Sequence, residues 1–343
     1  MIIETGVLIL GIVLLILITS DVLITTLSLG VGGPITSRFS AGVWYLALRI
    51  HRKYPSHKTL SLVGWLLLIL IAVMWYLLAW FAWTVVFSSF PGAIIEASTY
   101  RPASFLQRFA YTGNTISTLG RGDYAPQGFP WELATTIAST NGFVLVTLTF
   151  AYLLPLIQAQ TKMRNSALYI QTIGIAPQEV VLRAWNGKDF GELAQHFISL
   201  APMLTEQGEN RLTYPMLHYL HSIERSRSIC LSIAILDEAM TILKYGLSDS
   251  VRPDKSALGS ARRASTAFLS TLESAFIKPG KKEPPLPSLE RLRERGIPTV
   301  SDREFWEATK HLYRRRKLLL TLVENDGWTW EDVTIEESFM ESM

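Results

Sequence analysis

Long apolar stretches separated by short polar segments dominate the first half of the chain. Three of them, residues 5–29, 61–87 and 131–157, exceed the roughly 20 apolar residues that a helix needs to cross a bilayer. The first has no basic start, carries Glu4, and runs on without a small-residue cleavage site, so we interpret it as a retained helix and not a signal peptide. The pattern predicts three membrane-spanning helices.

Helical periodicity continues outside these stretches. Between the first two, apolar residues recur at near-helical spacing at Phe39, Val43, Leu46, Ile50 and Tyr54. Basic residues occupy the other faces, which favours a helix lying in the membrane interface over a plain linker. From residue 160 the pattern is helical throughout, with one or two long helices over 214–246, a helix pair over 253–277 and a last helix over 301–327. We expect an all-α membrane protein.

Charge divides the chain. Residues 1–159 contain eight Lys/Arg and five Asp/Glu, whereas residues 160–343 contain 24 of each. No basic stripe typical of a nucleic-acid-binding domain is present, and the distribution indicates a membrane part followed by a soluble part. A single cysteine, Cys230, excludes an intrachain disulfide and a Cys-based zinc cluster.

The short loops predict the orientation. Five basic residues lie between the first two spans, no acidic residue occurs over 22–95, and Lys162 and Arg164 follow the third span. Because Lys and Arg concentrate in cytoplasmic loops, both regions should be cytoplasmic and the N-terminus outside. The sequence therefore predicts a multi-pass protein of the cell membrane with a cytoplasmic C-terminal domain.

The segment between the second and third spans has an unusual composition. Residues 104–116 predict an amphipathic helix too short to cross, and T-L-G-R-G-D follows at residues 118–123. Paired glycines favour backbone conformations that other residues avoid, which in a soluble protein would indicate a turn. Non-helical backbone survives at membrane depth only where it lines water or is buried in protein. A re-entrant loop lining a pore meets that condition.

This segment resembles the potassium-channel filter signature T-V-G-Y-G-D, with the pore helix before it and the inner helix after it at the distances typical of that family. The resemblance covers residues 60–157 and implies a potassium-channel-like pore module of outer helix, pore helix with filter loop, and inner helix. The predicted domains are an N-terminal transmembrane and interfacial helix (1–58), the pore module (59–158) and an α-helical cytoplasmic domain (159–343).

The resemblance also implies roles for single residues. Permeating potassium ions would exchange their hydration shell for the carbonyls of Thr118, Leu119, Gly120, Arg121 and Gly122. The cavity would be lined by Ser139, Phe143, Val146 and Phe150. Gating would bend the inner helix at Gly142 or at Pro155, because proline removes a helix hydrogen bond. One loop per chain implies a homotetramer, with the extra first helix outside the pore ring and no cofactor beyond the ions.

Arg121 departs from the family, which usually has an aromatic or apolar residue there. Four guanidinium groups near the outer ion sites would be costly unless paired. Asp123 is the nearest candidate partner, with Glu132 second, and Asn114 stands where many relatives carry an acid behind the filter. We therefore expect Asn114 and Asp123 to support the filter. A weakly selective or non-conducting pore homologue is the alternative that Arg121 raises.

Other features leave further alternatives. Asp21, inside the first span, is interpreted as paired with Arg38 or Arg49, with a gating contact as the alternative. His218, His221 and Glu224 share a predicted helix face, but surface or core roles are favoured over zinc binding.

Two further alternatives concern the second half of the chain. The basic run at 314–317 fits a solvated helix face balanced by acids better than a lipid contact. No catalytic grouping appears, so an enzyme is not expected. A membrane-anchored scaffold or signalling protein acting through its helical domain is the alternative from another functional class.

Overall fold

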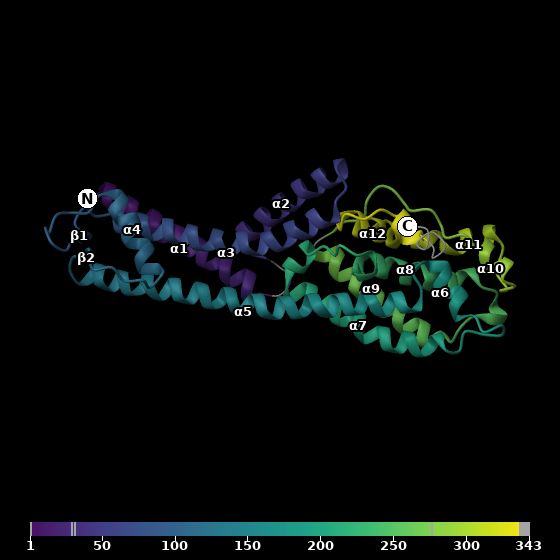
Figure 1. Ribbon diagram of the computed structural model, residues 1–343. Coiled ribbons are helices and arrows are strands. Elements are labelled where there is room, and N and C mark those ends of the chain that lie inside the picture. The colour runs from purple at the N-terminus through teal and green to yellow at the C-terminus, as the bar shows by residue number, and fades with distance from the viewer. Residues whose placement is uncertain (1, 29, 31, 276, 336–343) are drawn as a thin grey trace. The chain divides into compact units, whose positions relative to one another are not determined.

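The computed structural model describes residues 2–28, 30, 32–275 and 277–335 and confirms an all-α membrane protein (Figure 1). It comprises two compact units. The first contains Met1–Val43 and Leu66–Pro155, and the second contains Trp44–Trp65 and Leu156–Met343. Helices α2 (Pro34–Lys53), α3 (His57–Ser88) and α5 (Phe129–Ile173) each continue from one unit into the other.

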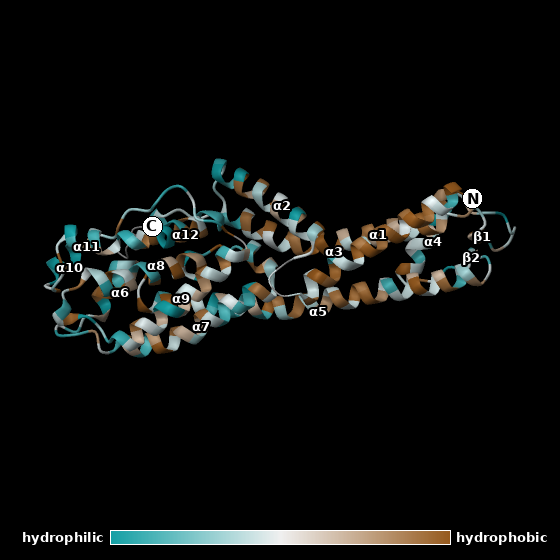
Figure 2. Ribbon diagram, turned by 180° about the vertical axis from the view of Figure 1, so that it is seen from behind, coloured by the Kyte–Doolittle hydropathy of each residue, from teal (hydrophilic) through white to brown (hydrophobic). Residues whose placement is uncertain are grey.

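Three helices, α1 (Ile2–Leu27), α3 and α5, are long and apolar enough to cross a membrane, as the sequence predicts. Hydrophobic residues predominate along α1 and α3 (Figure 2). Residue 29, the last of the first predicted span, lies outside the described residues. The third helix does not end near residue 157 but passes Pro155 unbroken and ends at Ile173.

The segment between α3 and α5 forms strand β1 (Ile94–Glu96), helix α4 (Phe105–Ile116) and strand β2 (Tyr124–Pro126). The two strands pair antiparallel, with Ile95 opposite Ala125. Three residues are too few for an alternating pattern to appear in the sequence. This two-stranded sheet joins the chain before α4 to the chain just after the glycine segment, so that α4 and the glycine segment lie between its strands.

Asp21 occupies a buried site built from three helices of the first unit. Its carboxylate accepts hydrogen bonds from the backbone N–H of Ile35 at 2.6 Å, from the Thr36 hydroxyl at 2.5 Å and from Trp75 Nε1 at 3.0 Å. The expected pairing with Arg38 or Arg49 is therefore wrong. Asp21 instead caps the first turn of α2, where a carboxylate also complements the helix dipole.

The second unit is a helical domain whose central helix, α8 (Ile229–Thr241), is buried along its whole length. The helices around it are α6 (Pro177–Ala184), α7 (Leu193–Thr213), α9 (Lys255–Ala275), α10 (Glu290–Glu294), α11 (Asp302–Thr309), α12 (Tyr313–Asn325) and α13 (Glu331–Thr334). Short 3₁₀ turns cover Pro215–Tyr219, Arg225–Arg227, Asp249–Val251 and Lys310–Leu312, and a π turn covers Ile242–Gly246.

Three helix predictions need correction here. Residues 214–246 do not form one or two long helices, because a 3₁₀ turn and irregular backbone precede Ile229 and α8 ends at Thr241. One helix, α9, replaces the predicted pair over 253–277. The last predicted helix begins at the expected cap, Ser301, whose side chain and Glu304 form a capping box, but it is divided by the 3₁₀ turn at Lys310–Leu312.

The basic run of α12 is a solvated face only in part, because Arg314 is exposed whereas Arg316 is buried. Arg315 Nε donates to the buried Asp237 carboxylate at 2.8 Å, and Arg316 Nε donates to Glu238 at 2.9 Å with both side chains about 2% exposed. Arg262 Nη1 lies 3.2 Å from Asp237. Two of the acids that balance the run are thus buried on α8, and Glu273 on α9 pairs with Arg314. These charges hold α9 and α12 against α8.

Candidate functional site

Helix α4 begins with a well-defined N-terminal cap. The Ser104 side chain accepts from the Gln107 N–H, and the Gln107 side chain accepts from the Ser104 N–H at 2.7 Å. Such a capping box satisfies two N–H groups that the first turn leaves without a helical partner. The predicted short helix is therefore confirmed, with Ser104 as its cap and Phe105 as its first residue.

Side-chain hydrogen bonds hold α4 between α3 and α5. Trp80 Nε1 on α3 donates to the Phe109 carbonyl at 2.7 Å, and the Tyr111 hydroxyl lies 2.8 Å from Thr135 Oγ1 on α5. Arg108 Nη2 donates to the Pro91 carbonyl at 2.6 Å. None of these three bonds joins two opposite charges. Each satisfies a polar group that would otherwise be costly to bury in an apolar medium.

Two glycines let the helices approach closely. A Cβ at Gly113 would lie 2.4 Å from the Trp80 ring, and a Cβ at Gly142 would lie 2.0 Å from the Ile116 carbonyl oxygen. Real side-chain carbons do not come that close, so a larger residue would require movement of the Trp80 ring at Gly113 and of the backbone at Gly142. Gly142 therefore packs α5 directly against the end of α4, a contact that the predicted hinge role did not anticipate.

The backbone turns sharply where α4 ends. Thr118 N–H donates to the Thr115 carbonyl at 3.0 Å and Leu119 N–H donates to the Asn114 carbonyl at 3.0 Å, the two bonds of a Schellman ending. Thr118 takes the left-handed conformation with φ 56°, as does Gly120 with φ 61°. A β-branched residue in that region is strained, and such strain concentrates at functional sites.

Residues 117–123 are exposed in the single chain. Arg121 Nε lies 3.5 Å from Asp123 Oδ2, with both side chains about two-thirds exposed, so the first of the two candidate partners makes the contact. An exposed pair of this kind contributes about 0–1 kcal/mol. The Asp123 carbonyl accepts from Ala97 N–H at 3.0 Å, which ties the segment to the residue that follows β1.

Of the predicted cavity-lining side chains on α5, Phe143, Val146 and Phe150 are exposed in the single chain, and Ser139 is half-buried. Gly142 and Pro155 both lie inside one continuous helix. Three of the four side chains that the resemblance assigns to the cavity are therefore exposed within the single chain. The roles of these residues in lining and gating stay predictions.

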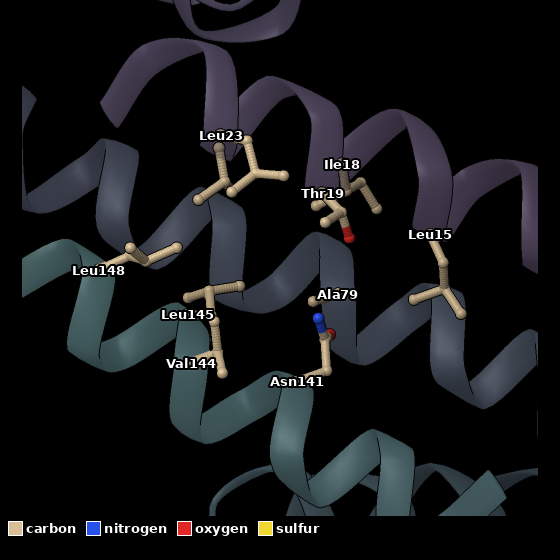
Figure 3. A pocket seen from close by; sticks show the side chains of 10 residues that line it. Leu15, Ile18, Thr19, Leu23, Ala79, Asn141, Val144, Leu145 and Leu148 are labelled. Carbon is tan, nitrogen blue, oxygen red and sulfur yellow. The ribbon is translucent and has the colours of Figure 1, made fainter. Parts of the chain in front are cut away.

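Helix α1 packs beside α3 and α5. A Cβ at Gly11 would lie 2.7 Å from Val86, so α1 and α3 are in close contact. Further along, a cavity of about 40 Å³ lies between the three helices (Figure 3). Its lining is apolar except for Thr19 and Asn141, and the Asn141 side-chain oxygen accepts from Trp83 Nε1 at 3.1 Å.

Hydropathy alone places the tryptophans of α3 among lipid-facing and interfacial anchors. Trp75, Trp80 and Trp83 instead donate hydrogen bonds to Asp21, α4 and α5. The small residues Ala79 and Ala82 could have indicated this buried face, because they lie on it at helical spacing from the tryptophans.

The zinc alternative receives no support. His218 lies in a 3₁₀ turn and His221 in the irregular segment after it, so the two do not share a helix face. Among the described residues no group of three or more His, Cys, Asp or Glu side chains is placed to hold a metal ion. The Cys230 thiol is buried, which raises its pKa far above the usual range and makes it unreactive.

Comparison with known proteins agrees with this geometry. Residues 65–159 match the family described as Ion channel. Over 326 residues, covering 95% of both chains, the protein is 34% identical to the uncharacterized membrane protein YdjJ of Bacillus subtilis strain 168. No solved structure matches the chain. The protein thus belongs to the family of this membrane protein, and its residues 65–159 form an ion channel domain.

Proposed function

We propose that four copies of the chain form a channel that passes potassium ions down their gradient. The observation that carries this proposal is the exposed segment 117–123, held at the end of a helix that is fixed between two spanning helices. Four such segments around one axis would supply the rings of carbonyl oxygens that replace an ion's hydration shell. A single segment cannot close a ring, so the proposal requires the homotetramer.

Each element of the pore has a proposed role. The carbonyls of residues 118–122 bind the ions, and Asn114 and Asp123 support them. Ser139, Phe143, Val146 and Phe150 face the water-filled cavity, and α5 bends at Gly142 or Pro155 when the pore opens. The second unit lies in the cytoplasm and regulates the pore, and the N-terminus lies outside, as the basic loops favour.

Arg121 favours a second candidate, a pore homologue that conducts weakly or not at all. Its guanidinium is exposed and contacts Asp123 at 3.5 Å. Four convergent copies would bring four such groups near the mouth of the pore, where incompletely neutralised charge repels cations. The two candidates predict different responses to removing this charge.

Flux measurements separate them. The purified protein in liposomes should carry potassium at least tenfold faster than sodium, and its mass in detergent should be four times the 38.5 kDa chain, after subtraction of bound detergent. Arg121→Tyr should keep this selectivity, and Arg101→Tyr, an exposed arginine of the same extracellular segment, serves as the matched control. Wild-type protein without flux beside a conducting Arg121→Tyr variant would establish the second candidate. A monomer or dimer without flux in any variant would refute both and favour the scaffold.

A further inference from the structure

The turn between α2 and α3 docks onto two segments distant in sequence, all within the second unit. Trp44 Nε1 donates to the Asn325 carbonyl at 3.1 Å, and His51 Nε2 lies 3.1 Å from the Gly327 carbonyl. The fit is close, because a Cβ at Gly64 would lie 2.4 Å from the Tyr219 carbonyl oxygen. The contact covers the turn that leads directly into α3.

Three imidazoles meet at this contact, and we name His51, His57 and His221 the histidine cluster. Ring centroids are 5.0 Å apart for His51 and His57, and 5.1 Å apart for His57 and His221. His57 also stacks on Trp328 at 4.0 Å. His51 and His221 are buried, so water screens these rings poorly.

The hydrogen bonds define a neutral state for the rings. Ser56 N–H donates to His51 Nδ1 at 3.1 Å, so that nitrogen carries no proton and Nε2–H donates to Gly327. His57 Nδ1 and His221 Nε2 lie 3.0 Å apart, a distance that holds one hydrogen between them. If both rings were protonated, two N–H groups would face each other and the bond would be lost.

The surrounding charges compensate only part of the charge that protonation would add. His221 Nδ1 lies 3.6 Å from Asp326, whose other oxygen accepts from the Ser228 hydroxyl at 3.1 Å. The Asp332 carboxylate also favours the protonated form of His57. Asp326 favours the protonated form of the neighbouring His218 as well, which the Arg211 guanidinium disfavours. Among the described residues, one proton on the rings therefore has a countercharge at salt-bridge distance, and a second has none so near.

We propose that the histidine cluster is a proton-binding site whose uptake of more than one proton releases the α2–α3 turn from the rest of the second unit. Neutral rings favour the docked state, so docking is complete above about pH 6.5, the ordinary pKa of histidine, and weakens as pH falls. Because the turn is continuous with α3, which holds α4 through Trp80, release is expected to change the conductance of the pore. This last step rests on the proposed function, whereas the proton site does not.

Hydrogen exchange of the full-length protein in detergent tests the site directly. After correction for the intrinsic pH dependence of exchange, residues 44–60 should lose at least tenfold protection between pH 7.5 and pH 5.5. Residues 229–241 of α8 should stay protected over that range as the internal reference. Unchanged protection of residues 44–60, or parallel loss in α8, would overturn the proposal.

Variants sharpen the result. His57→Gln and His221→Gln should each at least halve the pH response, and Asp326→Asn should move the loss to higher pH. His311→Gln, a partly exposed histidine bonded to Tyr245, should follow the wild-type profile as the matched control. A full pH response in both cluster variants would also reject the site.

Flux in liposomes distinguishes this inference from the proposed function. If wild-type protein conducts, conductance should change as the cytoplasmic side is acidified below pH 6.5, and His57→Gln should reduce that change. An exchange response without any flux would keep the proton site and remove the channel. Flux with no exchange response would keep the channel and remove the proton site.

Discussion

The two units satisfy their buried polar groups by different means. In the first, indole, hydroxyl and amide groups bond across helices, as Trp80 does to a carbonyl of α4 and Trp83 does to Asn141. In the second, buried carboxylates on α8 face arginines, as Asp237 faces Arg315 and Arg262. In the first unit the buried charges of Asp21 and Arg108 are bonded to neutral groups, whereas the second unit pairs buried charges with one another.

The difference matters because the two kinds of contact carry different desolvation free energies. A neutral hydrogen bond leaves no net charge to desolvate, whereas an ion pair repays its desolvation only when the geometry is good and both partners remain. Loss of one partner should therefore be far more damaging in the second unit. It also follows that the second unit should respond to pH more strongly than the hydrogen bonds of the first.

The largest effect is expected at Asp237. Asp237→Ala leaves Arg315 and Arg262 buried without their carboxylate and should destabilise the second unit by about 3–5 kcal/mol. Thermal unfolding of the full chain in detergent measures this. Glu273→Ala, which removes the exposed partner of Arg314, is the matched control and should cost at most about 1 kcal/mol. Equal losses in both variants would contradict the comparison.

Gly142 provides the corresponding change in the first unit. Gly142→Ala places a carbon where the Ile116 carbonyl lies, and relieving that overlap by backbone movement should cost about 1–3 kcal/mol. We expect loss of flux together with weaker hydrogen-exchange protection of α4. Gly42→Ala, in an open position on α2, is the control and should be neutral or slightly stabilising. If Gly142→Ala blocked gating but left α4 as protected as wild type, Gly142 would act as a hinge alone.

Sequence reasoning recovered the elements set by local pattern. The three spans, the short α4 and the start of the last helix at Ser301 follow from apolar length, periodicity and capping chemistry, which neighbouring residues determine. It failed where long-range contact decides, as for Arg315 and Asp237, which are 78 residues apart in sequence. The histidine cluster is harder still, because 164 residues separate His57 from His221. Hydropathy also cannot tell a lipid-facing tryptophan from one that bonds a neighbouring helix.

A smaller effect is expected from the neutral bonds themselves. Trp80→Phe keeps the aromatic packing but leaves the Phe109 carbonyl without its 2.7 Å donor, which should cost about 1–2 kcal/mol. Hydrogen exchange of residues 105–116 should report the loss locally. Trp65→Phe, a more exposed position on the same helix, should leave α4 unchanged. A loss as large as that of Asp237→Ala would contradict the distinction between neutral and charged contacts.

The smallest effect is expected from pH acting on His218. Burial and the nearby Arg211 guanidinium lower the pKa of His218 to about 4. In the unfolded chain the pKa is about 6.5, so the ring contributes stability above about pH 6.5 that is progressively lost toward pH 4. The ring nitrogen Nδ1 is buried while the residue as a whole keeps some contact with water, so we expect only part of the free energy that this shift in pKa represents, on the order of 1 kcal/mol. His218→Gln should flatten the unfolding temperature of the second unit between pH 7 and pH 4 relative to wild type, and His196→Gln should not. A wild-type profile in His218→Gln would assign the acid response to the histidine cluster instead.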